Sequence, residues 1–181
     1  MMNKWRTLSK KKLLTSELFE VIRTRFELPN GKIKIREDVF RKPTVCVFPI
    51  DGSFIYLISE YRELWGERML HAVAGFLDKE GETTLECAKR ELLEEAGIKA
   101  SHWEEISRYR LAASVIKGVT SLFLAKNLEF AGQKPEDDEN IKVIKLSFKD
   151  AVGKVLNGEI SDSATMIGIL MIENLKRKKR T

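Results

Sequence analysis

Several carboxylates lie at helical spacing near the middle of the chain. Glu91 and Glu95 are four residues apart and Glu94 is three from Glu91, so in a helix they project from one narrow sector. Arg90, one turn before Glu94, neutralises this cluster only in part. Carboxylate oxygens on a rigid helix suit a hard divalent cation, Mg²⁺ or Mn²⁺. The alternative is an acidic helix face exposed to solvent.

The residues around the cluster predict the helix that would carry it. Thr83 or Thr84 can cap its start, and Gly97 suits the left-handed turn that ends a helix. A glycine-rich loop beginning at Gly75 comes before it. Apolar residues at helical spacing form a stripe that we expect to pack on a sheet: Leu85, Ala88, Leu92 and Ala96.

The order of residues in this stretch resembles the Nudix box, whose pattern is G-x5-E-x7-R-E-U-x-E-E-x-G-U with U apolar. From Glu82 to Ile98 the chain reads E-x7-R-E-L-x-E-E-x-G-I, which fills every specified position. Gly75 is separated from Glu82 by six residues where the family has five, and we interpret the extra residue as a loop insertion. The resemblance implies an α/β fold, a Nudix α/β/α sandwich with a mixed sheet. It also implies hydrolysis of a nucleoside diphosphate linked to another group.

The resemblance also implies a role for each residue of the box. Glu91 and Glu95 would ligate Mg²⁺, or Mn²⁺, together with the backbone carbonyl of Ala74. Glu94 would hold another ion or a metal-bound water, and Arg90 would orient the glutamates. Glu82 would stabilise the loop or orient the ligands from outside the metal site.

Two short segments before the box resemble the subgroup of Nudix enzymes that act on ADP-ribose and nucleotide sugars. Residues 60–62 read EYR and residues 71–75 read HAVAG, in partial agreement with Q-Y-R and E-x-P/V-A-G. By this resemblance Arg62 would contact a substrate phosphate; the alternative is an ion-pair partner. His71 stands where the subgroup commonly has glutamate, and it is otherwise a hydrogen-bonded residue at the end of a strand.

An acidic segment, GQKPEDDEN at residues 132–140, precedes a predicted strand at 141–146. In the subgroup a glutamate of this loop acts as general base or orients the attacking water, and Glu139 matches it best. Asp137 and Asp138 lie behind it, and a solvated acidic turn is the alternative.

The substrate that the resemblance favours is ADP-ribose, cleaved to AMP and ribose 5-phosphate. The chain has Ala-Ala-Ser at 112–114 where ADP-ribose enzymes commonly carry a proline-containing turn. A nucleotide sugar such as GDP-mannose and a modified nucleoside triphosphate therefore remain alternatives. A non-catalytic module that binds a nucleotide and regulates a partner is a further alternative.

The chain is predicted to divide at about residue 42. Residues 1–42 form a β extension with a hairpin turn at Asn30–Gly31, and residues 43–181 form the Nudix domain. A two-stranded hairpin is marginal alone, and in the subgroup it often takes part in dimer formation, so we expect a homodimer. Trp5 lies just before the hairpin, where it either packs or stacks on a substrate base.

The remaining elements follow from periodicity and turn signals. A hairpin at Asp51–Gly52 joins two apolar strands, 44–50 and 53–59. Ser147 and Asp150 are typical of a helix start. A last helix is predicted over 161–176, with a buried face made of Ile167, Leu170, Met171 and Leu175.

Composition limits the class of protein. With 181 residues, 43% of them apolar, the chain can bury a substantial core. The two cysteines form no CxxC pair, which indicates no disulfide framework and a reducing cytoplasm. No apolar run is long enough to span a membrane. The net charge of +5 resides partly in the tail at 176–180, which we interpret as solubilising rather than as a nucleic-acid site.

Overall fold

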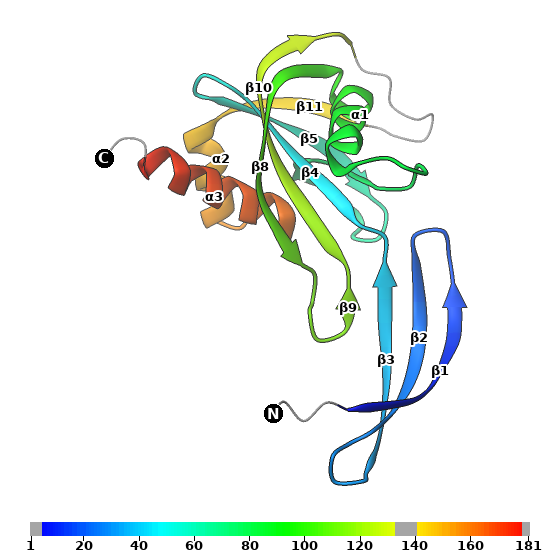
Figure 1. Ribbon diagram of the computed structural model, residues 1–181. Helices are drawn as coiled ribbons and strands as arrows, with labels where there is room; N and C mark the ends of the chain where they lie inside the picture. The colour runs from blue at the N-terminus through cyan, green and yellow to red at the C-terminus, as the bar shows by residue number, and fades with distance from the viewer. Residues whose placement is uncertain (1–4, 133–140, 179–181) are drawn as a thin grey trace. The chain divides into compact units, whose positions relative to one another are not determined.

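The computed structural model describes residues 5–132 and 141–178, and Figure 1 labels its strands and helices. The chain divides into two compact units. The first consists of Met1–Pro43 and Tyr109–Val119, and the second of Thr44–Arg108 and Thr120–Thr181.

Within its described residues, the first unit contains a four-stranded sheet in the order β1-β2-β3-β9. The first three strands are antiparallel and β9 runs parallel to β3. The strands span Arg6–Thr15 (β1), Phe19–Glu27 (β2), Ile33–Arg41 (β3) and Ile116–Lys117 (β9).

The turn between β2 and β3 lies at Asn30–Gly31, which confirms the predicted hairpin. Gly31 has a φ of 78°, a left-handed conformation that glycine adopts without steric cost. The Asn30 side-chain oxygen accepts a hydrogen bond from the Lys32 backbone N–H at 3.1 Å. Asparagine and glycine therefore both suit the geometry of this turn.

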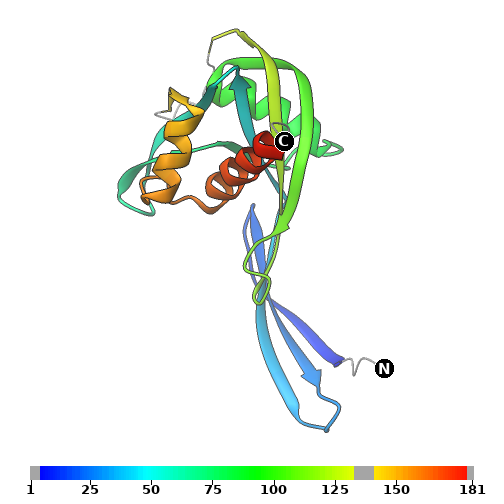
Figure 2. The same ribbon diagram turned by 90° about the vertical axis from the view of Figure 1, so that its left-hand side faces the viewer.

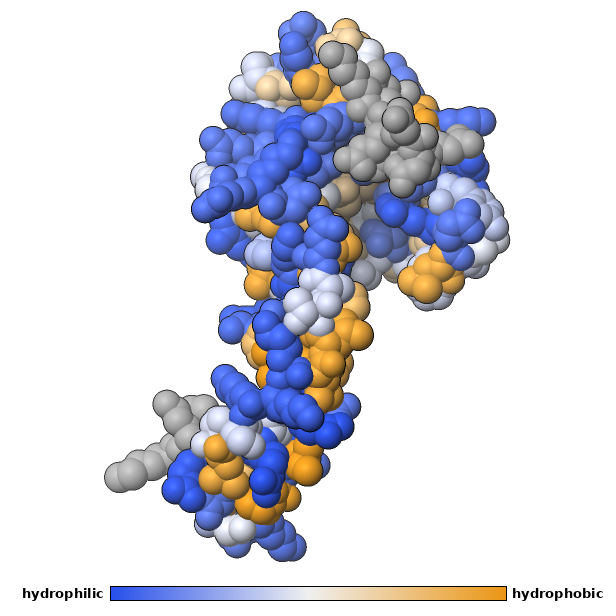
Figure 3. All heavy atoms as spheres, turned by 90° about the vertical axis from the view of Figure 1, so that its right-hand side faces the viewer, coloured by the Kyte–Doolittle hydropathy of each residue, from blue (hydrophilic) through white to orange (hydrophobic). Residues whose placement is uncertain are grey.

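The first unit buries little of its own surface. Among its described residues, only Thr24 and Gly118 are buried. Figure 3 shows apolar side chains gathered on the surface of this unit. Exposed apolar residues occur on all of its longer strands, and they include Leu8, Leu14, Phe19, Ile33 and Ile35.

The second unit contains a larger mixed sheet, whose described strands follow the order β11-β5-β4-β10-β8, with β6 on β5 and β7 on β4. The parallel pair is β4 and β10, in register from Thr44 opposite Thr120. The strands span Thr44–Asp51 (β4), Phe54–Arg62 (β5), Glu67–His71 (β6), Val73–Phe76 (β7), Ile98–Arg110 (β8), Val119–Phe130 (β10) and Lys142–Ser147 (β11).

Helices cover both faces of this sheet, as Figures 1 and 2 show. Helix α1 (Thr84–Ala96) packs on β4 and β7, while α2 (Phe148–Leu156) and α3 (Ser163–Lys178) pack on the opposite face. Val45 and Val47 of β4 are fully buried in the cluster that contains Leu92 of α1. This is the α/β/α arrangement that the sequence predicts, and it places the glutamate helix directly on the sheet.

The predicted buried face of α3 is wrong. Leu170 is exposed, and Ile167, Met171 and Leu175 are only partly buried. The helix instead approaches the sheet through small residues, and a Cβ on Gly168 would lie 2.0 Å from Phe48 Cζ. Close approach to Phe48 thus decides which stripe is buried: Ala164, Thr165, Gly168, Ile169 and Ile172.

No helix in the described part of the chain is both long enough and apolar enough to cross a lipid bilayer.

Candidate active site

Helix α1 begins and ends at the predicted residues. Thr83 Oγ1 accepts a hydrogen bond from the Glu86 backbone N–H at 3.2 Å, and Glu86 Oε2 accepts one from the Thr83 N–H at 2.8 Å. This reciprocal capping box fixes the first turn. Gly97, with a φ of 64°, ends the helix in a left-handed conformation. The glutamates therefore lie on a helix whose length and rotation are set locally.

Arg90 joins the acidic residues around α1. Its Nε donates to Glu82 Oε1 at 2.8 Å, and its Nη1 donates to Glu91 Oε1 at 2.6 Å and to Glu94 Oε2 at 3.0 Å. Its Nη2 donates to Asp78 Oδ1 at 3.2 Å. The hydrogen bonds to Glu82, followed by the charge of Glu91, raise the pKa of Arg90 despite partial burial. Arg90 is therefore a permanent cation that holds three glutamates of the box in place.

Glu91 lies against the backbone of β7. A Cβ added to Gly75 would lie 1.9 Å from Glu91 Oε1, so only glycine leaves room for this carboxylate. Burial raises the pKa of Glu91 to about 7, although Arg90 acts in the opposite direction. A carboxylate that burial drives toward its neutral form is one whose ionised form an added cation would stabilise.

Glu95 reaches the same strand one residue earlier. Its side chain is buried, with 6% of the residue exposed, and its Oε2 accepts a hydrogen bond from the Ala74 N–H at 3.0 Å. The structure thus brings Glu91 and Glu95 to consecutive backbone positions, Gly75 and Ala74. Glu94, by contrast, has a side chain that is 40% exposed.

The donors at this position suit a hard divalent cation. Ala74, Glu91 and Glu95 offer carbonyl and carboxylate oxygens, which Mg²⁺ and Mn²⁺ prefer. Within residues 5–132 and 141–178, no three acidic, histidine or cysteine side chains already converge as an ion site. Arg90 is the cation that contacts Glu91 in this structure. These oxygen donors suit the predicted metal. Arg90 orients one of them, the Glu91 carboxylate, through a hydrogen bond.

A second group of charged side chains lies on β5 and β6. Arg62 Nη2 is 2.8 Å from Glu60 Oε2 and 3.3 Å from His71 Nε2, and His71 Nε2 is 3.3 Å from Glu60 Oε2. His71 and Glu60 are largely buried, whereas 43% of the Arg62 side chain is exposed. Desolvation is the main cause that lowers the pKa of His71. Arg62 is an ion-pair partner here, with part of its guanidinium facing solvent.

Two polar contacts hold the segment between β6 and β7. The Ala72 N–H donates to Thr165 Oγ1 at 2.9 Å, and Thr165 Oγ1 donates to Asp162 Oδ2 at 2.6 Å. Thr165 is fully buried at the start of α3. The strand that carries Ala74 is therefore anchored on one side by Glu95 and on the other by α3.

Sequence reasoning missed Glu60 and Thr165 as parts of this arrangement. Glu60 could have been found, because it stands two residues before Arg62 in a strand and so shares its face. Thr165 is the only polar residue among the buried positions of α3, but nothing in its local sequence points to Ala72.

Two further residues were predicted to contact the substrate or the attacking water, Glu139 and Trp5. Glu139 lies outside the described residues. Trp5 belongs to the first unit, where its ring meets that of Phe26 edge to face with centroids 5.5 Å apart. Its proposed contact with a substrate base stays a prediction.

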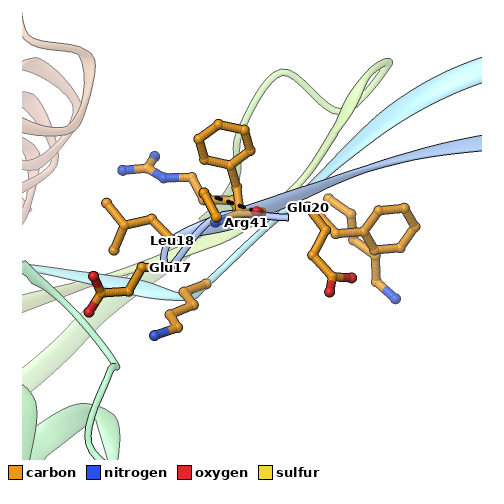
Figure 4. Close-up of a pocket in the computed structure, with 9 residues that line it drawn as sticks. Glu17, Leu18, Glu20 and Arg41 are labelled. Atoms are coloured by element: carbon orange, nitrogen blue, oxygen red, sulfur yellow. Dashed lines mark hydrogen bonds between the residues drawn. The ribbon is translucent and has the colours of Figure 1, made fainter. Parts of the chain in front are cut away.

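The first unit has an open hollow of about 370 Å³ at the turn between β1 and β2. Figure 4 shows Glu17 and Leu18 pointing to one side of this turn and Glu20 to the other, with Arg41 beside them. The lining mixes both signs of charge, since Lys42 and Lys117 also contribute.

Comparison with known proteins places the chain in a family. The NUDIX domain model matches residues 40–163. The chain therefore belongs to the Nudix family, as the box predicts, and it is a hydrolase that acts on pyrophosphate bonds.

Individual relatives agree with this assignment. An ADP-ribose pyrophosphatase of Mycobacterium tuberculosis is 30% identical over 170 residues, which cover 92% of this chain and 82% of the relative. A GDP-mannose pyrophosphatase of Yersinia enterocolitica is 26% identical over 147 residues, which cover 78% and 66%. A crystal structure of an ADP compounds hydrolase superposes with a TM-score of 0.88 at 20% identity, covering 99% of this chain and 97% of that one. The last comparison confirms the fold.

Proposed function

We propose that this Nudix hydrolase requires a divalent cation and cleaves ADP-ribose to AMP and ribose 5-phosphate. The observation that carries the proposal is the placement of Glu91 and Glu95 against consecutive backbone positions of β7. The similarity to an ADP-ribose pyrophosphatase along most of both chains supports the choice of substrate.

Ala74, Glu91 and Glu95 would hold Mg²⁺ or Mn²⁺, with Glu94 beside them. When bound, the ion supplies positive charge that reduces the repulsion between a pyrophosphate and an incoming nucleophile. Arg90 keeps the carboxylates of Glu91 and Glu94 oriented through its two Nη1 hydrogen bonds. Carboxylates that are already oriented need little reorganisation when the substrate arrives.

Contacts to the substrate are assigned to residues outside the box. Arg62 would donate hydrogen bonds to a phosphate oxygen, because its guanidinium is partly exposed and carries a permanent charge. Glu139 would accept a proton from the attacking water or orient it, since a general base must lie within hydrogen-bond reach of that water. Trp5 would stack on the substrate base.

A panel of dinucleotides, nucleotide sugars and triphosphates, each with Mg²⁺ or Mn²⁺, tests the proposed substrate. ADP-ribose should yield AMP and ribose 5-phosphate, and neither product should release inorganic phosphate until a phosphatase is added. Release of phosphate or pyrophosphate without a phosphatase, from a triphosphate alone, would contradict the choice of ADP-ribose. Binding of ADP-ribose without any product would instead favour a regulatory module.

Glu95→Gln should abolish metal-dependent turnover while the protein stays folded, because the variant keeps an acceptor near the Ala74 N–H but loses the charge. EDTA should abolish turnover of the wild type, and Mg²⁺ or Mn²⁺ should restore it. Glu104→Gln, on an exposed position of β8, removes the same charge and should leave activity unchanged. Turnover of Glu95→Gln at the wild-type rate in saturating Mg²⁺ would refute the metal-site assignment.

A second candidate substrate is GDP-mannose, which the similarity to a GDP-mannose pyrophosphatase favours. The same panel separates the two, since cleavage of the pyrophosphate in GDP-mannose yields GMP and mannose 1-phosphate. The substrate with the higher kcat/KM is the one for which the site is built.

We also infer that the first unit forms a homodimer contact. Its described part buries only Thr24 and Gly118, and exposed apolar side chains such as Leu14 and Ile35 lie on its strands. A sheet with so little internal core needs a further apolar surface to cover it. Light scattering tests this inference, and a monomer at micromolar concentration would contradict it.

A further inference from the structure

Glu60, Arg62 and His71 share one face of the sheet in the second unit. Glu60 and Arg62 are two residues apart on β5, and His71 of β6 pairs directly with Ile58, which is two residues before Glu60. Because side chains alternate along a strand, all three project from the same face as Ile58. A diagonal neighbour across two strands is within reach of a long side chain, which explains how these groups meet.

The position of the Glu60 carboxylate is energetically unfavourable in the folded protein. Its Oε2 atom is buried, and no donor in the described part of the chain meets it with hydrogen-bond geometry, although Arg62 Nη2 lies 2.8 Å away. A buried carboxylate oxygen without an aligned donor is destabilising. The charged neighbour of this oxygen is Arg62, with which Glu60 forms an ion pair.

The hydrogen bonds of His71 define which of its nitrogens is the acceptor. Nδ1 lies 3.0 Å from the Ala72 carbonyl oxygen, an acceptor only, so Nδ1 carries the proton. In the neutral ring Nε2 is then an acceptor, and it faces Arg62 Nη2 at 3.3 Å. The Ala72 carbonyl therefore sets the tautomer of a ring that accepts from Arg62.

Arg62 is thus held at one nitrogen by an ion pair with Glu60 and by a hydrogen bond to His71. Within the described residues, the side-chain contacts of Arg62 are made by Nη2, to Glu60 and to His71. The guanidinium is planar and its donors have fixed relative directions, so holding Nη2 restricts the directions in which Nη1 and Nε can point. An anchored, partly exposed guanidinium binds an anion with less loss of side-chain entropy than a mobile one.

We propose that Glu60 and His71 are positioning residues that orient the Arg62 guanidinium toward a phosphate of the substrate. The inference rests on the proposed function, in which Arg62 contacts that phosphate. In its neutral form His71 accepts a hydrogen bond from Arg62 and orients it without adding charge. Protonation of Nε2 would remove this acceptor and place a second positive charge beside Arg62.

Four variants test the inference on the full-length protein with ADP-ribose and Mg²⁺. His71→Leu removes the acceptor, His71→Gln restores one near the position of Nε2, and Glu60→Gln removes the charge. His102→Leu changes the other histidine, exposed on β8, and is the matched control. We expect KM to rise roughly tenfold in His71→Leu, the size of one charge-assisted hydrogen bond, with kcat within about twofold.

The conservative variants distinguish a positioning role from a purely structural one. KM of His71→Gln should lie close to the wild-type value, and KM of Glu60→Gln should rise. In the wild type 1/KM should fall as the pH is lowered and His71 becomes protonated, among the charges of Glu60, Arg62 and Asp162 that face it. This acid dependence should be absent in His71→Gln. An unchanged KM in a folded His71→Leu, or an equal loss of kcat in both His71 variants, would overturn the inference.

The activity of the wild type shows whether the proposed function, rather than the positioning role, is wrong. If the wild type hydrolyses another substrate of the panel, the variants are compared on that substrate. If it hydrolyses none, calorimetric binding of ADP-ribose to the same proteins decides the matter. Binding that weakens in His71→Leu and recovers in His71→Gln supports the positioning role, whereas equal binding, or none, rejects it.

Discussion

At the residue scale, the site depends on how closely Glu91 approaches the backbone of β7. The carboxylate occupies the space that any side chain at position 75 would fill, so glycine here serves close packing rather than an unusual turn. Glu95 makes the complementary contact, to the Ala74 N–H. Two long side chains are thereby held in one arrangement before any ligand binds, which reduces the cost of reorganisation.

Gly75→Ala should lower kcat at least tenfold, because its Cβ would lie 1.9 Å from Glu91 Oε1 and must displace the carboxylate. Misplacement of a ligand by about 1 Å can cost a hundredfold in rate. Steady-state kinetics with ADP-ribose and Mg²⁺ measure the loss. Gly153→Ala on α2, where an added Cβ meets nothing within 4 Å, is the control and should be fully active. Wild-type kinetics in folded Gly75→Ala would show that Glu91 is not needed at this position.

His71 should make stability depend on pH. Its pKa is lowered in the folded state, mainly by desolvation, so the unfolded chain binds more protons once the pH falls below about 6.5. The stability present above that pH is therefore lost as the pH decreases through the folded-state pKa. The raised pKa of Glu91 acts in the opposite sense, and stability from that group is lost as the pH rises from about 4.5 toward about 7.

The difference in unfolding free energy between wild type and His71→Gln isolates the histidine. Urea denaturation at a series of pH values from 5 to 8 should show that the wild type loses stability relative to His71→Gln as the pH is lowered. A difference that stays constant across the range would mean that His71 titrates alike in the folded and unfolded states.

At the element scale, the second unit is organised by how closely its helices approach the sheet. Helix α1 carries both an apolar stripe and the glutamates, so its burial fixes the rotation of the box. Helix α3 packs through Ala164 and Gly168, and Thr165 also holds Ala72, which directly precedes the strand that carries Ala74. A change in the packing of α3 is therefore expected to alter the position of Ala74 in the site.

Gly168→Ala should destabilise the protein by up to about 2 kcal/mol, which is the usual overpacking cost of about 1–3 kcal/mol less a gain in helix propensity. The added Cβ would lie 2.0 Å from Phe48 Cζ, and Phe48 is fully buried in β4. The gain in helix propensity when alanine replaces glycine is about 1 kcal/mol. Urea denaturation measures the change, and Gly153→Ala, which has the same propensity gain without a clash, should be neutral or stabilising. A stabilised Gly168→Ala would contradict the packing of α3.

At the scale of the whole molecule, the two units differ in how they are stabilised. The second has an extensive buried core, whereas the described residues of the first include only Thr24 and Gly118 as buried positions. Residues 109–119 complete the first unit's sheet from a distant part of the chain. The first unit is therefore the part of the molecule whose folding is expected to depend on an additional apolar surface.

Ile35→Asp should shift the protein from dimer toward monomer. Ile35 is 56% exposed on β3, so the charge is tolerated in a monomer but is costly in an apolar interface. Light scattering across a concentration series measures the change in mass. Phe130→Asp, on an exposed apolar residue of β10, is the control and should leave the mass unchanged. Equal masses for all three proteins would remove Ile35 from the interface.

Much of the architecture followed from local sequence signals. Thr83 and Gly97 delimit α1 through hydrogen bonds within a few residues, and Asn30–Gly31 and Asp51–Gly52 form the expected hairpins. These features depend on backbone propensity and short-range contacts, which a single sequence contains. The spacing of the glutamates on α1 has the same origin, and the family match confirmed what the box indicated.

By itself, then, the sequence determined the glutamate helix, its ends, the hairpins and the family. Only the tertiary structure decided that Glu91 lies on Gly75, that Glu95 binds the Ala74 N–H, and that Arg62 is held by Glu60 and His71. It also decided which stripe of α3 is buried. The physical reason is that these contacts join separate elements, so they depend on strand pairing and on the distance of closest approach between helix and sheet, which no local pattern encodes.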